Sequence, residues 1–251
     1  MERVIGPLRA SVARLHGLVG GFDDGQLEGP SYDSDWTVAD VLSHLGSGAV
    51  LMERRLDDAR SGVESTIDPQ PVWDEWNAKT PRAKADDALT EDERLLRSIA
   101  SLTESQWEEL TFNFGPVTVG VEAAVALRLN EHAFHTWDIE VMSDKGATLP
   151  PDAVAVVVDN LGFIARFTAK PAGGEREVWV RTTDPERHFT VRLTDESAEL
   201  LEGDAGASDD LVLPAEAFCR LVYGRLDPDH SPEVDENGEV LDLLRRVFPG
   251  P

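Results

Sequence analysis

A glutamate and a histidine stand four residues apart in the segment LRLNEHAFHTWD, residues 127–138. An α-helix turns about 100° per residue, so Glu131 and His135 would project about 40° apart and both could reach one ion. His132, about 60° from His135, would point away from the pair. A carboxylate and an imidazole at this spacing could bind a divalent metal, or they could hydrogen-bond to each other on a solvated face.

The position of this pair within an apolar stripe favours the metal. Four apolar residues project into the same sector of the helix: Ala124, Leu127, Phe134 and Met142. We therefore expect Glu131 and His135 to face inward, where an ionised carboxylate is costly unless it is paired or bound to a metal. Three protein ligands with one open position form the usual catalytic arrangement, so the site needs a histidine from another helix.

A second helix supplies a candidate for that histidine. Helical periodicity continues from residue 38 to residue 56, and Thr37 with Asp40 forms a predicted capping box at its start. His44 lies toward the edge of the apolar stripe, where a metal ligand and a packed structural histidine are both compatible with the pattern. Gly48, one turn further on, leaves space for a neighbouring helix or a ligand.

Two segments together, WTVADVLSHL at 36–45 and NEHAFHTWD at 130–138, resemble the mycothiol-dependent maleylpyruvate isomerase family, a branch of the DinB-like metal-binding four-helix bundles. The resemblance covers the N-terminal part of the chain well and the C-terminal third less specifically. It implies that three residues hold one divalent metal, usually zinc: His44, Glu131 and His135. The resemblance also favours His44 over His16 and His132 as the third ligand.

The ligand set determines the chemistry that we expect. Two neutral imidazoles and one carboxylate leave a divalent ion positively charged, which suits zinc best without excluding nickel, iron or manganese. Such an ion can bind and deprotonate a thiol at neutral pH. Cys219, the single cysteine, lies in an apolar helical pattern far from these motifs, so we expect it to be buried and inert and the thiol to be a small molecule.

The resemblance implies mycothiol as that thiol, acting as cosubstrate. Addition of its thiolate to the cis double bond of maleylpyruvate would allow rotation, and elimination would give fumarylpyruvate. Two alternatives stay open: a mycothiol S-transferase that keeps the adduct with an electrophile, and a non-catalytic metal-containing binding protein. All three share the predicted metal site, so the choice of reaction rests on the family alone.

Patterns along the chain predict an α+β fold. Helical periodicity over residues 1–20, over the helix of His44, over 72–102 with a break at Pro81, and over the helix of Glu131 implies an antiparallel four-helix bundle, with an irregular connection at 103–120. A change in composition near Pro150 marks a domain junction. The predicted domains are therefore a DinB-like bundle, residues 1–148, and a small α+β domain, residues 149–251.

The second domain combines helices with short β-rich runs. EVWVRTT, HFTVRLT, SAELLEG and LVLP predict a small antiparallel sheet, which is followed by a helix from residue 215 to about residue 223 and a short one over 241–247. By family resemblance this region would have a sterol-carrier-like fold.

Charge and hydropathy restrict the partners. The formal net charge is −25, from 23 basic and 48 acidic residues, and it argues against nucleic acids and anionic membrane surfaces. No apolar run is long enough to cross a bilayer, and the first ten residues have no signal-peptide core. We expect a cytoplasmic protein, a monomer or weak dimer, whose partners are a small thiol and an electrophile for which a dicarboxylate is one candidate.

A dicarboxylate substrate would need a local cation in so acidic a chain. Arg225, in LVYGRLDP, is a candidate catalytic residue because a guanidinium can bind a carboxylate through two parallel hydrogen bonds. In the family that the chain resembles, a basic residue of the second domain reaches over the metal cleft. The alternative is that Arg225 caps the preceding helix by bonding its last carbonyl groups.

Three further residue types flank the predicted ligands. Asp138 is a candidate partner for the second nitrogen of His135, although solvation on the helix surface is the role that we favour. Trp36, Phe134 and Trp137 could line the pocket, but we expect each to pack in the core.

Overall fold

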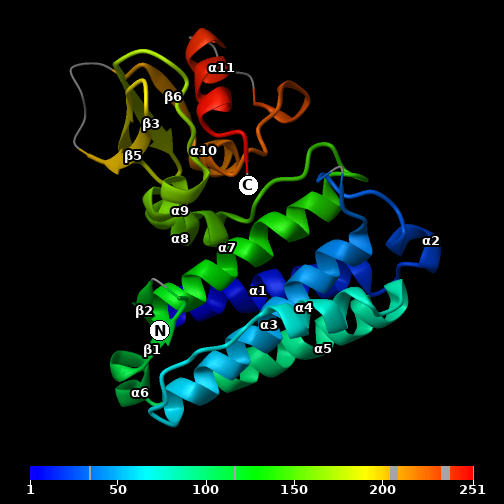
Figure 1. Ribbon diagram of the computed structural model, residues 1–251. Helices are drawn as coiled ribbons and strands as arrows, with labels where there is room; N and C mark the ends of the chain where they lie inside the picture. Colours follow the sequence, from blue (N-terminus) through cyan, green and yellow to red (C-terminus); the bar gives the residue numbers. More distant parts are fainter. Residues whose placement is uncertain (34, 116, 204–208, 233–237, 251) are drawn as a thin grey trace. The chain divides into compact units, whose positions relative to one another are not determined.

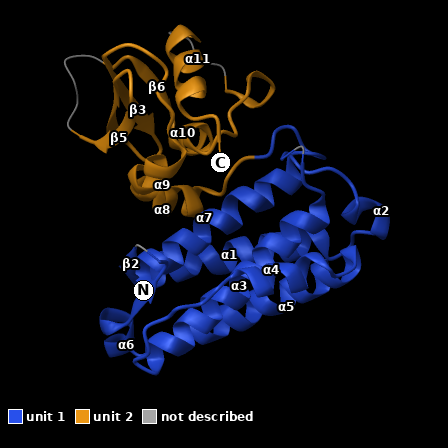
Figure 2. Ribbon diagram, viewed as in Figure 1, with its two compact units in different colours: residues 1–147 blue, residues 148–251 orange. Residues whose placement is uncertain are grey.

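The structure is a computed structural model that describes residues 1–250 except 34, 116, 204–208 and 233–237. The chain divides into two compact units, residues 1–147 and 148–251 (Figure 2). In its described residues the first unit is helical apart from one short hairpin, and the second combines helices with a four-stranded sheet (Figure 1). The molecule therefore has the mixed helix and sheet class that the sequence predicts, and the predicted junction lies next to the boundary of the units.

The described residues of unit 1 form seven helices and two strands. In chain order these are α1 (Glu2–Val19), α2 (Asp24–Leu27), α3 (Val38–Arg60), α4 (Gln70–Asn77), α5 (Pro81–Ala100), α6 (Glu104–Glu109), β1 (Thr111–Asn113), β2 (Thr118–Gly120) and α7 (Val121–Glu140). The predicted capping box of Thr37 and Asp40 starts α3, and Pro81 starts α5, so the third helical region is divided as expected. The connection at 103–120 was expected to be irregular but contains α6 and the β1–β2 hairpin, whose three-residue strands are too short to show an alternating pattern.

Helices α3 and α5 lie side by side in unit 1 and run in the same direction (Figure 1). Lys84, near the start of α5, donates to Asp40, near the start of α3. Arg60, the last residue of α3, donates to the carbonyl oxygen of Ser98, near the end of α5. The expected antiparallel order is wrong for this pair, because residues 61–80 return the chain to the end where α3 began.

Helices α1 and α7 are also parallel neighbours. Ion pairs link Arg3 to Glu122 near their starts and Arg14 to Glu140 near their ends. Helices α3 and α7, by contrast, run in opposite directions. This follows because the start of α3 lies beside the C-terminal half of α7, where His44 meets Glu131. The ligand-bearing helices are therefore an antiparallel pair, and their facing side chains can converge on one point.

Unit 2 begins with a run of short helices and ends with a helix after the sheet. In chain order its elements are α8 (Pro151–Val157), η1 (Val158–Asn160), α9 (Leu161–Thr168), β3 (Arg176–Thr183), β4 (Arg187–Leu193), β5 (Ala198–Glu202), β6 (Leu211–Pro214), α10 (Ala215–Val222), η2 (Pro228–His230) and α11 (Gly238–Val247). Each predicted strand and helix of this region is present. The described residues of the unit thus follow the pattern that the sequence indicates.

The sheet of unit 2 has the strand order β5–β4–β3–β6. Strands β3–β4 and β4–β5 pair antiparallel, but β3–β6 pair in parallel, so the expected all-antiparallel sheet is wrong at one edge. A four-residue apolar strand has no feature that reveals its pairing partner. Phe189 of β4 packs on Phe218 of α10, with ring centroids 4.9 Å apart, and the neighbouring Cys219 is buried, as expected. Across the described residues, no helix has the length and apolar character needed to cross a bilayer.

Candidate metal centre

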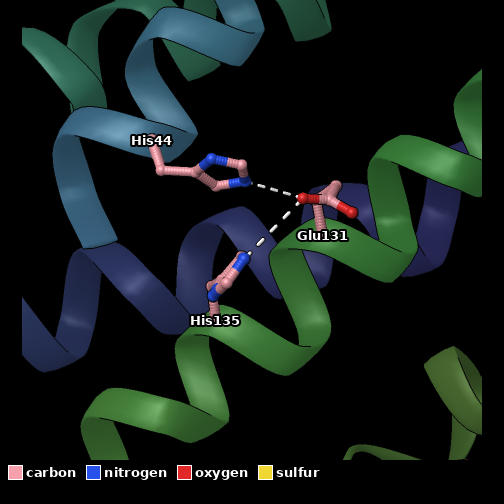
Figure 3. Close-up of side chains that lie close together, drawn as sticks. All are labelled: His44, Glu131 and His135. Atoms are coloured by element: carbon pink, nitrogen blue, oxygen red, sulfur yellow. Dashed lines mark hydrogen bonds and ion pairs between the residues drawn. The ribbon is translucent and has the colours of Figure 1, made fainter. Parts of the chain in front are cut away.

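The structure brings the three predicted ligands together at one point (Figure 3). His44 projects from α3, and Glu131 and His135 project from adjacent turns of α7. Nε2 of His44 lies 2.7 Å from Oε2 of Glu131, and Nε2 of His135 lies 3.7 Å from the same oxygen. One ligand atom from each residue lies within 4.8 Å of the other two, so the three side chains form a group that could hold a single metal ion.

The chemistry and exposure of these groups fit a catalytic divalent metal. Two imidazole nitrogens and one carboxylate oxygen are borderline ligands that suit zinc and its neighbours. The side chains of His44 and Glu131 are 37% and 42% exposed. Because the group is open on that side, a small molecule can approach it and complete the coordination.

Asp138 lies behind His135 and orients it. Its Oδ2 is 2.9 Å from Nδ1 of His135, and the whole residue is buried. The expectation that Asp138 is solvated on the helix surface is therefore wrong, because α7 is covered on this side as well. An ionised carboxylate only accepts hydrogen bonds, so Nδ1 carries the proton and Nε2 presents its lone pair toward Glu131.

Burial and local charges keep Glu131 and His135 in their metal-binding protonation states. Burial alone would raise the pKa of Glu131, but the hydrogen bond with His44 and the charge of His135 lower this pKa to about 2. Burial also lowers the pKa of His135, against the opposing effect of Asp138. At neutral pH the carboxylate is therefore ionised and this imidazole is neutral, which are the forms that bind metals.

A buried charge cluster, which we call the Asp92 cluster, lies on another face of α7. Asp92 of α5 accepts a hydrogen bond from Nη2 of Arg128 at 2.6 Å, and its Oδ2 lies 3.0 Å from Nε2 of His132. None of the three side chains is more than 5% exposed. The prediction that His132 points away from Glu131 and His135 is confirmed. The sequence did not reveal its partners, because Asp92 reaches it from a distant part of the chain.

Other residues near the ligands lie in part where they were expected. Trp36 is partly buried and packs against the core of unit 1, as expected, and its ring also stacks on that of His135, with centroids 5.9 Å apart and planes at 20°. Phe134 and Trp137 are buried as expected. Met142, assigned to the inward stripe, lies beyond the end of α7 and is half-exposed.

Two cavities adjoin His44 and are lined by residues of unit 1. The cavity that we call the arginine cavity has a volume of about 450 Å³ and is lined by His44, Glu131, Arg55, Arg128, Trp73 and Phe114 together with small and aliphatic side chains. The other, the polar cavity, has a volume of about 500 Å³ and is lined by Asp35, Trp36, Asp40, His44, Ser47, Gln70, Trp73 and Asn77. Because His44 and Trp73 line both, the candidate metal centre lies where the two cavities meet.

The space beside Gly48 is filled by the protein itself. A Cβ atom at this position would lie 2.8 Å from Nη1 of Arg128. The glycine thus allows the guanidinium of α7 to approach the backbone of α3, which is the close approach that the sequence suggested.

Arg225 lies in unit 2 directly after α10 and is buried. Its Nη1 donates a 2.8 Å hydrogen bond to the carbonyl oxygen of Tyr223, the C-cap residue of α10. Its backbone N–H donates to the carbonyl oxygen of Arg220. These contacts are of the kind that the helix-cap interpretation expects, and contact between Arg225 and a substrate stays a prediction.

Comparison with known proteins identifies the relatives of this arrangement. Residues 8–140 match the family described as the mycothiol maleylpyruvate isomerase N-terminal domain. Two solved structures are similar over 90% of this chain, each with 14% identity and a TM-score of 0.65. One is the mycothiol-dependent maleylpyruvate isomerase, of which 90% is covered, and the other is a histidine-to-alanine mutant of that enzyme, of which 89% is covered. At this identity the likeness shows the fold alone, and no curated protein matches the sequence.

Proposed function

The chain belongs to the mycothiol maleylpyruvate isomerase N-terminal domain family, and on this premise we propose that it is a mycothiol-dependent, divalent-metal-dependent isomerase of the maleylpyruvate type. The observation that carries the proposal is the convergence of His44, Glu131 and His135 at the junction of two cavities. Helical spacing within an apolar stripe favours Glu131 and His135 as metal ligands, and the family resemblance adds His44 as the third.

The finer description of the fold belongs to the same proposal. Unit 1 would be a DinB-like metal-binding four-helix bundle, and unit 2 an α+β domain of the sterol-carrier-like type. The lateral packing of α1, α3, α5 and α7 supports the first assignment, and the four-stranded sheet with its flanking helices supports the second.

The protein side chains have distinct roles in this mechanism. His44, Glu131 and His135 would hold the metal, which when bound supplies the positive charge that makes a thiol acidic at neutral pH. Asp138 retains the Nδ1 proton of His135 and so fixes the direction of its Nε2 lone pair. Trp36 covers the ring of His135 and limits the access of water from that side.

The thiol comes from mycothiol, because Cys219 is buried in unit 2 and burial raises the pKa of its thiol well above its ordinary value. The thiolate sulfur bonds to one carbon of the cis double bond, and the electron pair of that bond moves toward the conjugated carbonyl. The remaining single bond rotates. When the electron pair returns, the carbon–sulfur bond breaks, so the trans isomer leaves and the thiolate is regenerated.

The experiment follows both isomers of maleylpyruvate by NMR with the metal-loaded protein. We expect conversion only when mycothiol is present, and loss of conversion in Glu131→Ala. Glu122→Ala is the matched control, because Glu122 lies on the same helix and is exposed. A stable thioether detected by mass spectrometry would instead identify an S-transferase. Conversion without any thiol would refute the proposed mechanism.

A further inference from the structure

The arginine cavity has a charge opposite to that of the whole chain. The protein has 48 acidic and 23 basic residues, yet the formally charged residues that line this cavity are Arg55, Arg128 and Glu131. Glu131 already contacts His44 and His135. Arg128 is paired with Asp92, so Arg55 supplies the positive charge of the cavity wall that no carboxylate of the described residues neutralises, and within low-dielectric walls this charge attracts an anion.

Arg55 has donor groups to spare. Its Nε donates a 3.1 Å hydrogen bond to the carbonyl oxygen of Asn113, and its guanidinium carbon lies 4.9 Å from the ring centroid of Phe114. Both contacts hold the planar group in place at the cavity wall. Among the described residues no side chain or carbonyl accepts from its two terminal nitrogens, so these remain available to a ligand.

Arg128 is held even more firmly and also has unused donors. Its Nη2 donates to the carbonyl oxygen of Leu45 and to Asp92, while its buried Nε has no acceptor in the described part of the chain. Its Nη1 lies against Gly48. A guanidinium that is both 5% exposed and incompletely satisfied at a cavity wall is costly, and a bound carboxylate would offset that cost.

The polar cavity on the other side of His44 lacks this property. Its charged lining residues are Asp35 and Asp40, and no lysine or arginine among the described residues lines it. Asp40 pairs with Lys84 at 2.8 Å, which leaves Asp35 and a set of hydroxyl and amide groups. Such groups, beside Trp36, suit a hydroxyl-rich neutral molecule and offer a carboxylate hydrogen-bond donors but no positive charge.

We propose that the arginine cavity binds the carboxylate groups of an anionic electrophile through Arg55 and Arg128, and that the thiol approaches His44 from the polar cavity. This assignment rests on the proposed function and names the specificity-determining residues within unit 1. A volume of about 450 Å³ is ample for a small dicarboxylate. The reacting double bond then lies beside the candidate metal centre, since Glu131 and Arg128 line the same cavity one helical turn apart.

The test compares two adjacent arginines in the metal-loaded protein. Arg55→Gln and Arg54→Gln each remove one positive charge, but Arg54 is exposed and does not line the cavity. Calorimetric titration with maleate, and with its neutral dimethyl ester, measures the dissociation constants. We expect Arg55→Gln to weaken maleate binding roughly 10- to 100-fold, the usual loss for a hydrogen bond between charged groups, and to leave ester binding unchanged.

We expect Arg54→Gln to change maleate binding less than about twofold, because exposed charges are screened. Arg128→Lys keeps a positive charge beside Asp92 and should also weaken maleate binding, since an ammonium cannot form two parallel bonds. Thermal unfolding of each variant checks the fold. Equal losses in Arg54→Gln and Arg55→Gln, or equal losses for maleate and its ester, would overturn the assignment.

The same measurements separate this assignment from the proposed reaction. Maleate binding that depends on Arg55 without any mycothiol-dependent turnover would refute the isomerase and support the anion site. Mycothiol-dependent turnover with maleate binding insensitive to Arg55 would refute the anion site and support the isomerase.

Discussion

Helix α7 carries two histidines whose surroundings differ in one decisive way. Glu131 and His135 are partly exposed and share the site with a second imidazole ring, that of His44. His132 is fully buried, and its carboxylate partner Asp92 is already neutralised by Arg128. A carboxylate and an imidazole occur in both places. Only at the first is the carboxylate exposed and not paired with a lysine or arginine of the described residues, as the binding of a cation requires.

The comparison explains why residue types alone do not locate a metal site. The four-residue spacing of Glu131 and His135 was sufficient to predict that both lie on one face of the helix. It could not show that an arginine on the same helix completes the neighbouring cluster, because Asp92 comes from α5. Compensation of charge across helices is a property of the tertiary structure.

The largest effect should come from removing one ligand of the candidate metal centre. Glu131→Ala and His135→Ala each delete one of three metal-binding side chains, so we expect metal affinity to fall by roughly 10³-fold or more while the fold is retained. Metal analysis and circular dichroism of the purified variants measure both properties, with Glu122→Ala as control. If either variant still contains nearly one metal ion per protein, the metal does not bind on the face of α7 that carries Glu131 and His135.

The next largest effect should come from a change in the Asp92 cluster, and it should appear in the free energy of unfolding. Asp92→Asn leaves the buried charge of Arg128 unpaired, so we expect a loss of about 3–5 kcal/mol in the free energy of unfolding. Metal content should not change. Urea unfolding measures the loss, and Asp86→Asn, at an exposed position on the same helix, should cost almost nothing. Loss of the metal in folded Asp92→Asn would mean that the two clusters are not independent.

A smaller effect is expected at Asp138, whose carboxylate contacts His135 of the candidate metal centre. Asp138→Asn weakens the hydrogen bond that orients His135, so metal affinity should fall about 10- to 100-fold without abolishing binding. Competition with a chelator of known affinity measures the change. Asp144→Asn, at an exposed position just beyond α7, serves as control. An unchanged affinity would show that packing alone orients the ring.

The smallest effect is the pH dependence of the stability that the Asp92 cluster contributes. Burial alone would raise the pKa of Asp92, but His132 and Arg128 hold it below its ordinary value of 3.8. The stabilisation from Asp92 is therefore fully present above pH 3.8 and is lost as pH falls through the folded-state pKa. The stability difference between the wild type and Asp92→Asn, measured by urea unfolding, should stay constant from about pH 8 to 5 and shrink only below pH 3.8. A decrease near neutral pH would contradict this.

Local sequence signals were sufficient where a feature depends on near neighbours. The capping box of Thr37 and Asp40, the break at Pro81 and the inward position of Cys219 each follow from a few adjacent residues. The position of Asp138 did not, because α7 is buried around most of its circumference and a single apolar stripe describes it poorly.

Features that depend on distant partners were not predictable from these signals. Trp36 precedes α3 in the chain, and nothing in its local pattern indicates a stacked contact with His135 of α7. The parallel alignment of α3 with α5 depends on the path of residues 61–80, and the parallel pairing of β6 depends on which strand edge is free. Each is decided by packing rather than by periodicity.

The placement of the ligands on α3 and α7 has a consequence for folding. His44 and Glu131 are 87 residues apart in the chain, and α4, α5 and α6 lie between them. An ion bound to both would act as a reversible cross-link that closes this long loop, in the way that a disulfide does in proteins with paired cysteines. The unfolded chain would lose conformational entropy whenever the ion stayed bound. Metal supply would then determine how long the first unit persists in its folded form.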